Sequence, residues 1–405
     1  MQDEVFNLIK EEENRQQETI ALIPSENYAS MAVREATGCV LANKYAEGYP
    51  GRRYYQGNEV VDRVETMAIE RCKRLFNLES ANVQPYSGSP ANTAVLFALL
   101  EFGDVVCGMQ LSAGGHLTHG HPGITLSGKY FNSVQYGVNR DGRINYEEVA
   151  ELVKREKPKL IFAGTTAYPF KLDWKKFSEI AESIDAYLVA DISHIAGLIV
   201  GGVHESPSEY VHIVTSTTHK ILRGPRGAFV GVTRKGLEKD PELSRKIDRA
   251  VFPGLQGGPH ENAIAAMAIA FGEAESDSYL KYTKSVLRNA LVLAEEMKKS
   301  GLKIFGTENH LMLIDVGKEM GKEVAVRLEE VGIIVNANSI PFDEGKPFRP
   351  SGLRIGTPAV STRGMGESEM KMIASWIVQI VKGEGETEDI KKQVIELCKK
   401  FPIPE

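Results

Sequence analysis

The chain has 405 residues, of which 42% are hydrophobic and 25% charged, an ordinary globular composition with enough length for two domains. Its 48 basic and 54 acidic residues leave a net charge of −6 without any block rich in lysine and arginine, which excludes the basic surface of a nucleic-acid-binding protein. No apolar run reaches the ~18 residues that a membrane span needs, and the acidic N-terminus lacks the apolar core of a signal peptide.

The cysteines are four, widely spaced and without a CxxC pair: Cys39, Cys72, Cys107 and Cys398. Cysteines in this pattern are typically small buried residues of proteins in a reducing compartment. We therefore expect a cytoplasmic protein.

The first half of the chain predicts a helix, a polar stretch rich in glycine and tyrosine from Tyr45 to Glu59, and a second, amphipathic helix. After these, short β-branched runs alternate with amphipathic helices. The runs that we predict as buried strands include 105–106, 160–162, 187–189 and 211–214, and the helices between them include 146–156 and 174–183. This alternation predicts an α/β fold with a mostly parallel sheet flanked by helices.

The second half begins with a long helical stretch from Glu261 to about Ser300. The elements expected after it are 311–316, 319–331, 333–336, 353–356 and a terminal pair of helices. This pattern indicates a smaller α+β domain. We therefore predict an N-terminal helical arm at 1–45, a large α/β domain at 46–280 and a small C-terminal α+β domain at 281–405.

Two neighbouring strands end in groups that can do chemistry. The run from Tyr187 ends in Asp191, with His194 three residues later, and the next strand runs through Thr217 and His219 to Lys220. The C-terminal ends of parallel strands face the ligand crevice of such folds. Desolvation opposes the charge of a lysine between apolar neighbours, and Schiff-base chemistry uses lysines of this kind. The pair suits pyridoxal phosphate, with a lysine for the aldehyde and a carboxylate for the ring nitrogen.

A third strand, ending near 84–86, runs into Ser87, Gly88 and Ser89 ahead of the apolar helix 91–100. Hydroxyls and a glycine at a helix N-terminus form either an ordinary N-cap or an anion site. Beside the lysine and aspartate above, we interpret them as a phosphate site.

Two other patterns are weaker. The segment 123–130 is close to a nucleotide-binding P-loop, but Tyr130 stands where a serine or threonine must hold Mg²⁺. His116, His119 and His121 resemble a metal cluster, but no nearby cysteine or carboxylate completes it. We expect no metal, and we interpret the histidines as partners of a flat cofactor ring.

Taken together, these stretches resemble serine hydroxymethyltransferases, pyridoxal-phosphate enzymes of fold-type I. The resemblance extends from about Leu22 to Arg363 in the family's order. The matching segments are 23–27, 45–51, 53–55, 87–89, 115–120, 191 with 194, 217–220, 224–227, 252–259 and 351–358. Among the departures, Thr166 stands where the family usually has serine.

The resemblance implies a role for each matched residue. Lys220 would hold the cofactor covalently, Asp191 would pair with its ring nitrogen, His116 would stack on the ring and His194 would lie near its phenolic oxygen. The residues implied around the phosphate and the rest of the cofactor are Ser87, Gly88, Ser89, Thr166, His219, Tyr45 and, across a subunit interface, Gly257 and Gly258.

The resemblance also implies the substrate contacts. Arg354 would grip the substrate carboxylate with Ser25 beside it, and Glu47 would transfer protons at the hydroxymethyl group, accompanied by Tyr55. The positions implied to line the pterin pocket are Leu111, Leu117 and Asn338. Because the Tyr45–Tyr55 segment serves the neighbouring subunit in this family, a homodimer with shared active sites is implied.

The expected reaction is reversible transfer of the serine hydroxymethyl group to tetrahydrofolate or a related tetrahydropterin, which yields glycine and the methylene pterin. A pterin-independent threonine or allo-threonine aldolase, or a hydroxymethyltransferase acting on α-methylserine, would share much of this site. Glu47 favours the transferase, because an aldolase needs no acid facing a pterin. A binding protein on the same scaffold would not need both Lys220 and Arg354.

Overall fold

The computed structural model describes residues 3–346 and 348–404, which divide into two compact units. One unit comprises residues 29–283, and the other comprises residues 1–28 and 284–405. We predicted a separate N-terminal arm at 1–45 and a boundary at 280/281. In the structure the first 28 residues belong with the C-terminal unit instead, because β1 (Ile20–Ala21) pairs in parallel with β13 (Ile333–Ile334).

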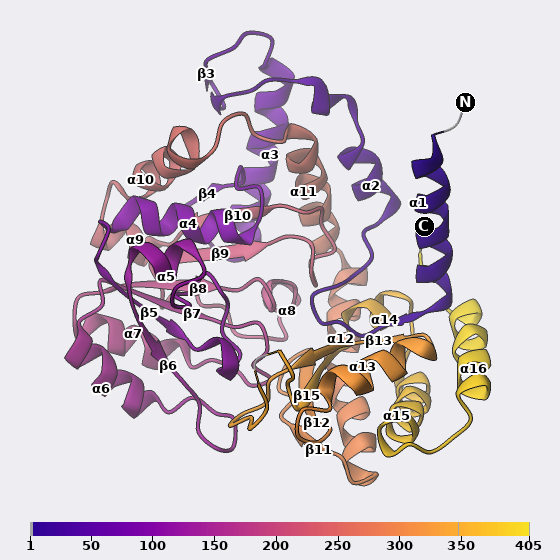
Figure 1. Ribbon diagram of the computed structural model, residues 1–405. Helices are drawn as coiled ribbons and strands as arrows, with labels where there is room; N and C mark the ends of the chain where they lie inside the picture. The colour runs from indigo at the N-terminus through magenta and orange to yellow at the C-terminus, as the bar shows by residue number, and fades with distance from the viewer. Residues whose placement is uncertain (1–2, 347, 405) are drawn as a thin grey trace. The chain divides into compact units, whose positions relative to one another are not determined.

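The 29–283 unit is built on a seven-stranded sheet of order β4-β10-β9-β8-β7-β5-β6 (Figure 1). The strands are β4 (Ser80–Asn82), β5 (Val105–Met109), β6 (Asn132–Tyr136), β7 (Leu160–Gly164), β8 (Tyr187–Asp191), β9 (Ile213–Thr217) and β10 (Ala228–Val232). The pairs from β6 to β9 are parallel, and β10 runs antiparallel to both β9 and β4. The predicted α/β class is confirmed.

Helices and short elements surround this sheet. They are α2 (Met31–Thr37), η1 (Val40–Asn43), β2 (Gly48–Tyr49), β3 (Arg52–Arg53), α3 (Glu59–Phe76), α4 (Gly88–Leu99), η2 (Leu111–Ala113), α5 (Leu126–Tyr130), α6 (Tyr146–Glu156), α7 (Trp174–Glu182), α8 (Ala196–Val200), α9 (Arg234–Lys239), α10 (Leu243–Arg249), η3 (Ala250–Leu255) and α11 (Glu261–Ala274). The strands β7, β9 and β10 are buried along their whole length, as a sheet covered on both faces requires.

Local sequence explains where the helices begin and end, as α6 illustrates. The Asn145 side chain caps it by accepting hydrogen bonds from the amides of Glu147 and Glu148. Acidic residues occupy its first turn and basic residues its last, which complements the helix dipole. Its end at Lys157 adopts the left-handed conformation typical of a helix C-terminus.

The other unit contains a four-stranded antiparallel sheet of order β11-β12-β15-β14. Its elements are α1 (Glu4–Glu18), β1, β11 (Lys303–Phe305), β12 (Leu311–Asp315), α13 (Gly321–Glu330), β13, β14 (Asn336–Asn338), β15 (Gly352–Gly356), α14 (Pro358–Thr362), α15 (Glu367–Lys382) and α16 (Thr387–Lys400). Ile20 and Leu22 are fully buried in the same apolar core as Ile314, Leu328 and Ile377. The division at 283/284 falls inside α12 (Asp277–Lys299).

Several features of the fold were not predicted, among them the short strand β11 and the helix α10. The strands β6 and β10 were missed, and the helical stretch from Glu261 is two helices, α11 and α12. The break between them comes at Ser276, whose Oγ accepts a hydrogen bond from the Tyr279 amide and so begins a new helix. Among the described residues, no helix is both long enough and apolar enough to span a membrane.

Candidate active site

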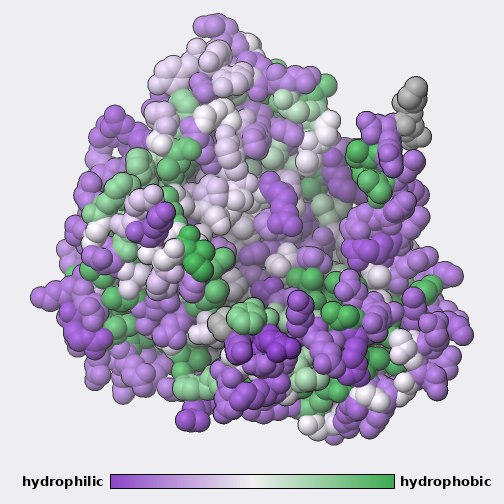
Figure 2. Space-filling view, in the orientation of Figure 1, coloured by the Kyte–Doolittle hydropathy of each residue, from purple (hydrophilic) through white to green (hydrophobic). Residues whose placement is uncertain are grey.

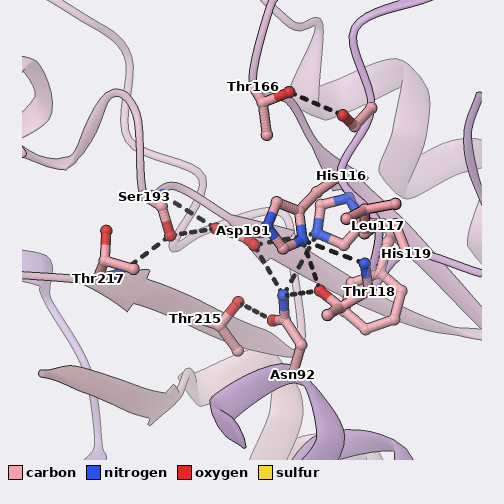
Figure 3. A network of polar contacts seen from close by, with 12 residues as sticks. Asn92, His116, Leu117, Thr118, His119, Thr166, Asp191, Ser193, Thr215 and Thr217 are labelled. Atoms are coloured by element: carbon pink, nitrogen blue, oxygen red, sulfur yellow. Dashed lines mark hydrogen bonds and ion pairs between the residues drawn. The ribbon is translucent and has the colours of Figure 1, made fainter. Parts of the chain in front are cut away.

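Asp191, the last residue of β8, is the centre of a buried polar network in the 29–283 unit (Figure 3). Its Oδ2 accepts hydrogen bonds from Asn92 Nδ2 at 2.8 Å and His119 Nε2 at 3.0 Å. Its Oδ1 accepts from Ser193, from the amide at 3.1 Å and from Oγ at 2.6 Å. The carboxylate is therefore held by donors on both oxygens.

The surroundings of Asp191 keep it ionised. Burial raises the pKa of this carboxyl, but the hydrogen bond from His119 and the electrostatic attraction of groups that include Lys220 outweigh burial. The resulting pKa lies far below the usual range of an aspartate. A buried, permanently negative group at the carboxyl edge of the sheet suits a protonated ring nitrogen.

His116 lies beside this network, with its ring centroid 5.4 Å from that of His119 (Figure 3). Its Nδ1 is 2.7 Å from the hydroxyl of Thr118 and accepts a hydrogen bond from the Thr118 amide at 3.1 Å. Burial is the main cause that lowers the pKa of His116, to about 4, so the imidazole is neutral at pH 7. A neutral, fixed ring of this kind suits stacking on a planar ligand.

Lys220 follows β9, the strand that pairs with β8, and its side chain is buried. The amide of Arg223 donates to the Lys220 carbonyl, and the amide of Gly224 donates to the Thr218 carbonyl, so a tight turn fixes the backbone at the lysine. Lys220 contributes to the electrostatic field at Asp191. The structure thus brings together the lysine and the carboxylate that the sequence paired.

The start of α4 has the features of a phosphate site. Among the described residues, the N-cap Ser87 makes no side-chain hydrogen bond to the amides of this helix. Gly88 lies so close to β9 that an added Cβ would be 2.7 Å from Thr217 Cγ2. Thr217 Oγ1 and His219 Nδ1 are buried and have no hydrogen-bond partner among the described residues. Free helix amides with unpaired polar atoms beside them fit a bound phosphate group.

His219 shares the character of His116. Burial is the first cause that lowers its pKa, to about 3, followed by the positive charges of Arg226 and Lys220. The ring is therefore neutral, with Nε2 3.3 Å from a guanidinium nitrogen of Arg226. We conclude that Lys220, Asp191 and the residues around them fit a cofactor with a pyridine ring and a phosphate.

The remaining residues predicted for the cofactor and the pterin in this unit lie on loops or in the interior. Thr166 follows β7, and its hydroxyl donates to the Gly115 carbonyl at 2.8 Å. His194 is buried after β8. Leu111 and Leu117 are partly exposed, as side chains that line an open pocket must be.

A second cluster contains the residues predicted to serve a neighbouring subunit. The rings of Tyr45 and Tyr55 are in edge contact, with centroids 5.0 Å apart. A Cβ added at Gly257 would lie 3.3 Å from Glu47 Oε1, and one added at Gly258 would lie 3.7 Å from the Tyr45 ring. Segments some two hundred residues apart in sequence are thus neighbours.

Three predicted substrate residues belong to the other unit: Ser25, Asn338 and Arg354. Arg354 is on β15, and its Nε donates to Asn336 Oδ1 at 3.0 Å on the paired strand β14. Burial is the main cause that lowers the pKa of Arg354, to about 10, so the guanidinium is still charged at pH 7. A partly buried, oriented cation of this kind suits a carboxylate ligand.

Three residues donate hydrogen bonds to Asp191. Sequence reasoning did not predict Asn92 or Ser193, and it assigned His119 a different role. Asn92 is buried on the apolar helix α4, where an amide needs a partner, and this was the available signal. His119 had been grouped with His116 and His121 as a metal-like cluster. Within the described chain, no three His, Cys, Asp or Glu side chains are arranged to hold a metal ion.

Known proteins are similar to this chain over nearly its full length. The family model described as serine hydroxymethyltransferase matches residues 1–377. A curated serine hydroxymethyltransferase of Acidothermus cellulolyticus is 52% identical over 99% of this chain and 95% of the relative. Those of Desulfotalea psychrophila and Francisella tularensis subsp. mediasiatica are each 49% identical over 99% of this chain and over 94% and 96% of the relatives. The chain therefore belongs to the serine hydroxymethyltransferase family.

Proposed function

We propose that this protein interconverts serine and glycine by transferring the hydroxymethyl group of serine to tetrahydrofolate. The observation that carries the proposal is the pairing of a buried lysine with a permanently ionised aspartate at the ends of adjacent parallel strands, in a chain of this family. Pyridoxal phosphate, when bound there, supplies a ring that stabilises negative charge on the α-carbon of the amino acid.

The residues around Asp191 would hold that group. Lys220 would bind it covalently, and the carboxylate of Asp191 would keep its ring nitrogen protonated. The free amides at the start of α4, with Ser87 and Ser89, would bind the phosphate. Thr217 Oγ1 and His219 Nδ1, which lack partners among the described residues, are suited to further contacts there.

The reacting amino acid needs its carboxylate bound and its protons managed. Arg354 would bind the carboxylate through a guanidinium that is already oriented by Asn336. Glu47 would transfer a proton at the hydroxymethyl oxygen and the pterin, assisted by Tyr55. Leu111 and Leu117 would contact the pterin, as would Asn338.

We also propose that the protein is a homodimer with shared active sites. Tyr45 and Tyr55 are about half exposed, and so are the apolar side chains of α1. Figure 2 shows a hydrophobic patch over α1, surrounded by hydrophilic surface. Apolar surfaces of this kind are typical of protein interfaces. Sedimentation equilibrium of the purified chain tests this assembly.

A cytoplasmic location is part of the proposal. All four cysteines are unpaired, which suits a reducing compartment. Fractionation of the producing cells, with detection of the untagged protein, tests the location.

The decisive experiment locates the covalent site. The protein is loaded with pyridoxal phosphate and reduced with borohydride, and the modified residue is identified by peptide mass. We expect modification at Lys220, and we expect Lys220→Ala to lose both the modification and serine conversion. Lys154→Ala on exposed α6 is the matched control and should behave as wild type.

The dependence on the pterin distinguishes the transferase from an aldolase. Serine conversion should require tetrahydrofolate, and Glu47→Gln should lower it by roughly 10²-fold or more without changing covalent modification. Threonine cleavage faster than serine conversion, indifferent to tetrahydrofolate, would overturn the proposal.

A further inference from the structure

The two clusters of predicted site residues in the 29–283 unit are joined by one short segment. Residues 84–86 immediately precede Ser87, at the start of the phosphate site. Two of these residues, Gln84 and Tyr86, make hydrogen bonds to the loop that carries Gly257 and Gly258. Residues 84–86 therefore lead into the proposed phosphate site and also bind the loop that is proposed to serve the neighbouring subunit.

The side chain of Gln256 makes the closest connection. Its Oε1 accepts a hydrogen bond from the Tyr86 amide at 3.1 Å, and its Nε2 donates to the Gln84 carbonyl at 2.9 Å. One amide group thus satisfies a backbone donor and a backbone acceptor two residues apart. This is the pairing that a neighbouring strand would provide, although Gln256 lies in a loop.

Tyr86 adds two contacts to the same loop. Its hydroxyl donates to the Gly258 carbonyl at 2.8 Å. Its ring stacks on His260, with centroids 4.2 Å apart and planes within 8° of parallel. Residues on both sides of the glycine pair are therefore fixed to the segment that leads into Ser87.

Gln84 extends the connection to the segment that carries Glu47. Its Nε2 donates to the Gly48 carbonyl at 2.9 Å and to Glu65 at 2.8 Å. Gln84 is thus hydrogen-bonded both to the backbone next to Glu47 and, through its own carbonyl, to the side chain of Gln256. Both parts of the cluster proposed to serve the neighbour are tied to residues 84–86.

We propose that Gln256 is a positioning residue that couples the two active sites of the dimer. The inference rests on the proposed function and its shared active sites, for which the family resemblance implies that Ser87 to Ser89 bind phosphate in their own subunit and that Gly257 and Gly258 reach the neighbour's. Loss of the Gln256 amide loosens both ends of the connection. Cofactor binding in each site therefore depends on Gln256 of both subunits.

Mixed dimers test the coupling. A Lys220→Ala subunit leaves one covalent site, whose occupancy is read by borohydride trapping and intact mass over a titration with pyridoxal phosphate. In the first dimer Gln256→Ala is in the subunit that keeps Lys220. In the second it is in the subunit that carries Lys220→Ala. The reference dimer has only Lys220→Ala.

We expect both arrangements to raise the half-saturating cofactor concentration, by about tenfold for the two hydrogen bonds lost. An effect in only one arrangement, or in neither, overturns the coupling. If the reference dimer itself takes up no cofactor at Lys220, the proposed function fails, which is a distinguishable result.

Two further measurements separate positioning from loss of folding. In the cofactor-free protein, amide exchange at Tyr86 should accelerate in Gln256→Ala while the melting temperature of the unit changes little. Tyr86→Phe, which removes only the hydroxyl bond to Gly258, should give a smaller shift in the same direction. Gln379→Glu, at a partly buried position of α15 in the other unit, is the control and should change neither quantity. Unchanged exchange at Tyr86 in Gln256→Ala would contradict the proposed role of its amide.

Discussion

Asp191 and Glu261 are both buried carboxyl groups in the 29–283 unit, yet their surroundings keep Asp191 ionised and favour a protonated Glu261. Four hydrogen bonds from three residues reach Asp191, and its pKa is far below the usual range. No described residue donates a hydrogen bond to either oxygen of Glu261, and the carboxylate of Glu65 lies close to it. Burial first, and then the negative charge of Glu65, raise the pKa of Glu261 to about 8.

The difference is not explained by a lack of positive charge near Glu261. Arg53 Nη1 is 3.5 Å from its carboxylate, but Arg53 makes shorter contacts with Glu65 at 2.6 Å and Asp62 at 2.8 Å. One guanidinium faces three carboxylates, so the cluster holds a proton rather than a third negative charge. Hydrogen-bond donors directed at the oxygens decide which buried carboxylate ionises.

The largest effect is expected from removing the ionised carboxylate. Asp191→Ala leaves the buried donors of Asn92, His119 and Ser193 without an acceptor, and should lower the free energy of unfolding by about 3 kcal/mol. Urea denaturation of the cofactor-free protein measures this value. Asp315→Ala, at the partly exposed end of β12, is the control, with a change near zero. A loss as small as that of the control would contradict the comparison.

The cation of the second cluster comes next. Arg53→Met leaves Asp62, Glu65 and Glu261 facing one another, and should cost about 2 kcal/mol at pH 8. Because protonation relieves the repulsion, the cost should shrink at pH 5. Denaturation at the two pH values tests this, and a cost that does not depend on pH would show that Arg53 acts through packing alone.

Glu261→Gln should have a smaller effect, since an amide resembles the protonated carboxyl. The pKa of Glu261 in the folded protein, about 8, exceeds the ordinary value of 4.5, so its contribution to stability is complete below pH 4.5. That contribution is lost as the pH rises through 8. The wild type should therefore lose stability between pH 6 and 9 more steeply than Glu261→Gln. Equal slopes in thermal melts across this range would refute the assignment.

The smallest effect on stability is expected at Thr217, whose hydroxyl has no partner among the described residues. Thr217→Val keeps the shape and should change the unfolding free energy of the cofactor-free protein by less than about 0.5 kcal/mol. Cofactor affinity should nevertheless fall several-fold if this hydroxyl binds the phosphate. Fluorescence titration with pyridoxal phosphate distinguishes a polar contact from a purely structural threonine.

The sheet was predictable where its strands are apolar and buried. The runs at 160–162 and 187–189 lie within β7 and β8, because a strand covered on both faces must be apolar along its length. β6 was missed because Asn132, Ser133 and Gln135 give it a polar sequence. β10 is also apolar and buried, but it was missed because Gly231 interrupts its short apolar run.

The site was predictable where residues occupy strand ends. Asp191 and Lys220 follow adjacent buried strands, so the sequence alone brings them to one edge. Asn92 donates to Asp191 from 99 residues earlier in the chain, and no spacing rule connects two positions so far apart. The hydrogen bonds of Gln256 to Gln84 and Tyr86 could not be predicted either, because these residues are also far apart in the sequence.

The pairing of β1 with β13 has a consequence for synthesis. β1 leaves the ribosome well before its partner β13, which lies some three hundred residues later in the chain. The 29–283 unit is complete by then and can fold first, as a continuous segment. Meanwhile Ile20 and Leu22, which end up fully buried, remain exposed to chaperones and to other chains. Ile20 and Leu22 are thus synthesised before the 29–283 unit but reach their final positions after it.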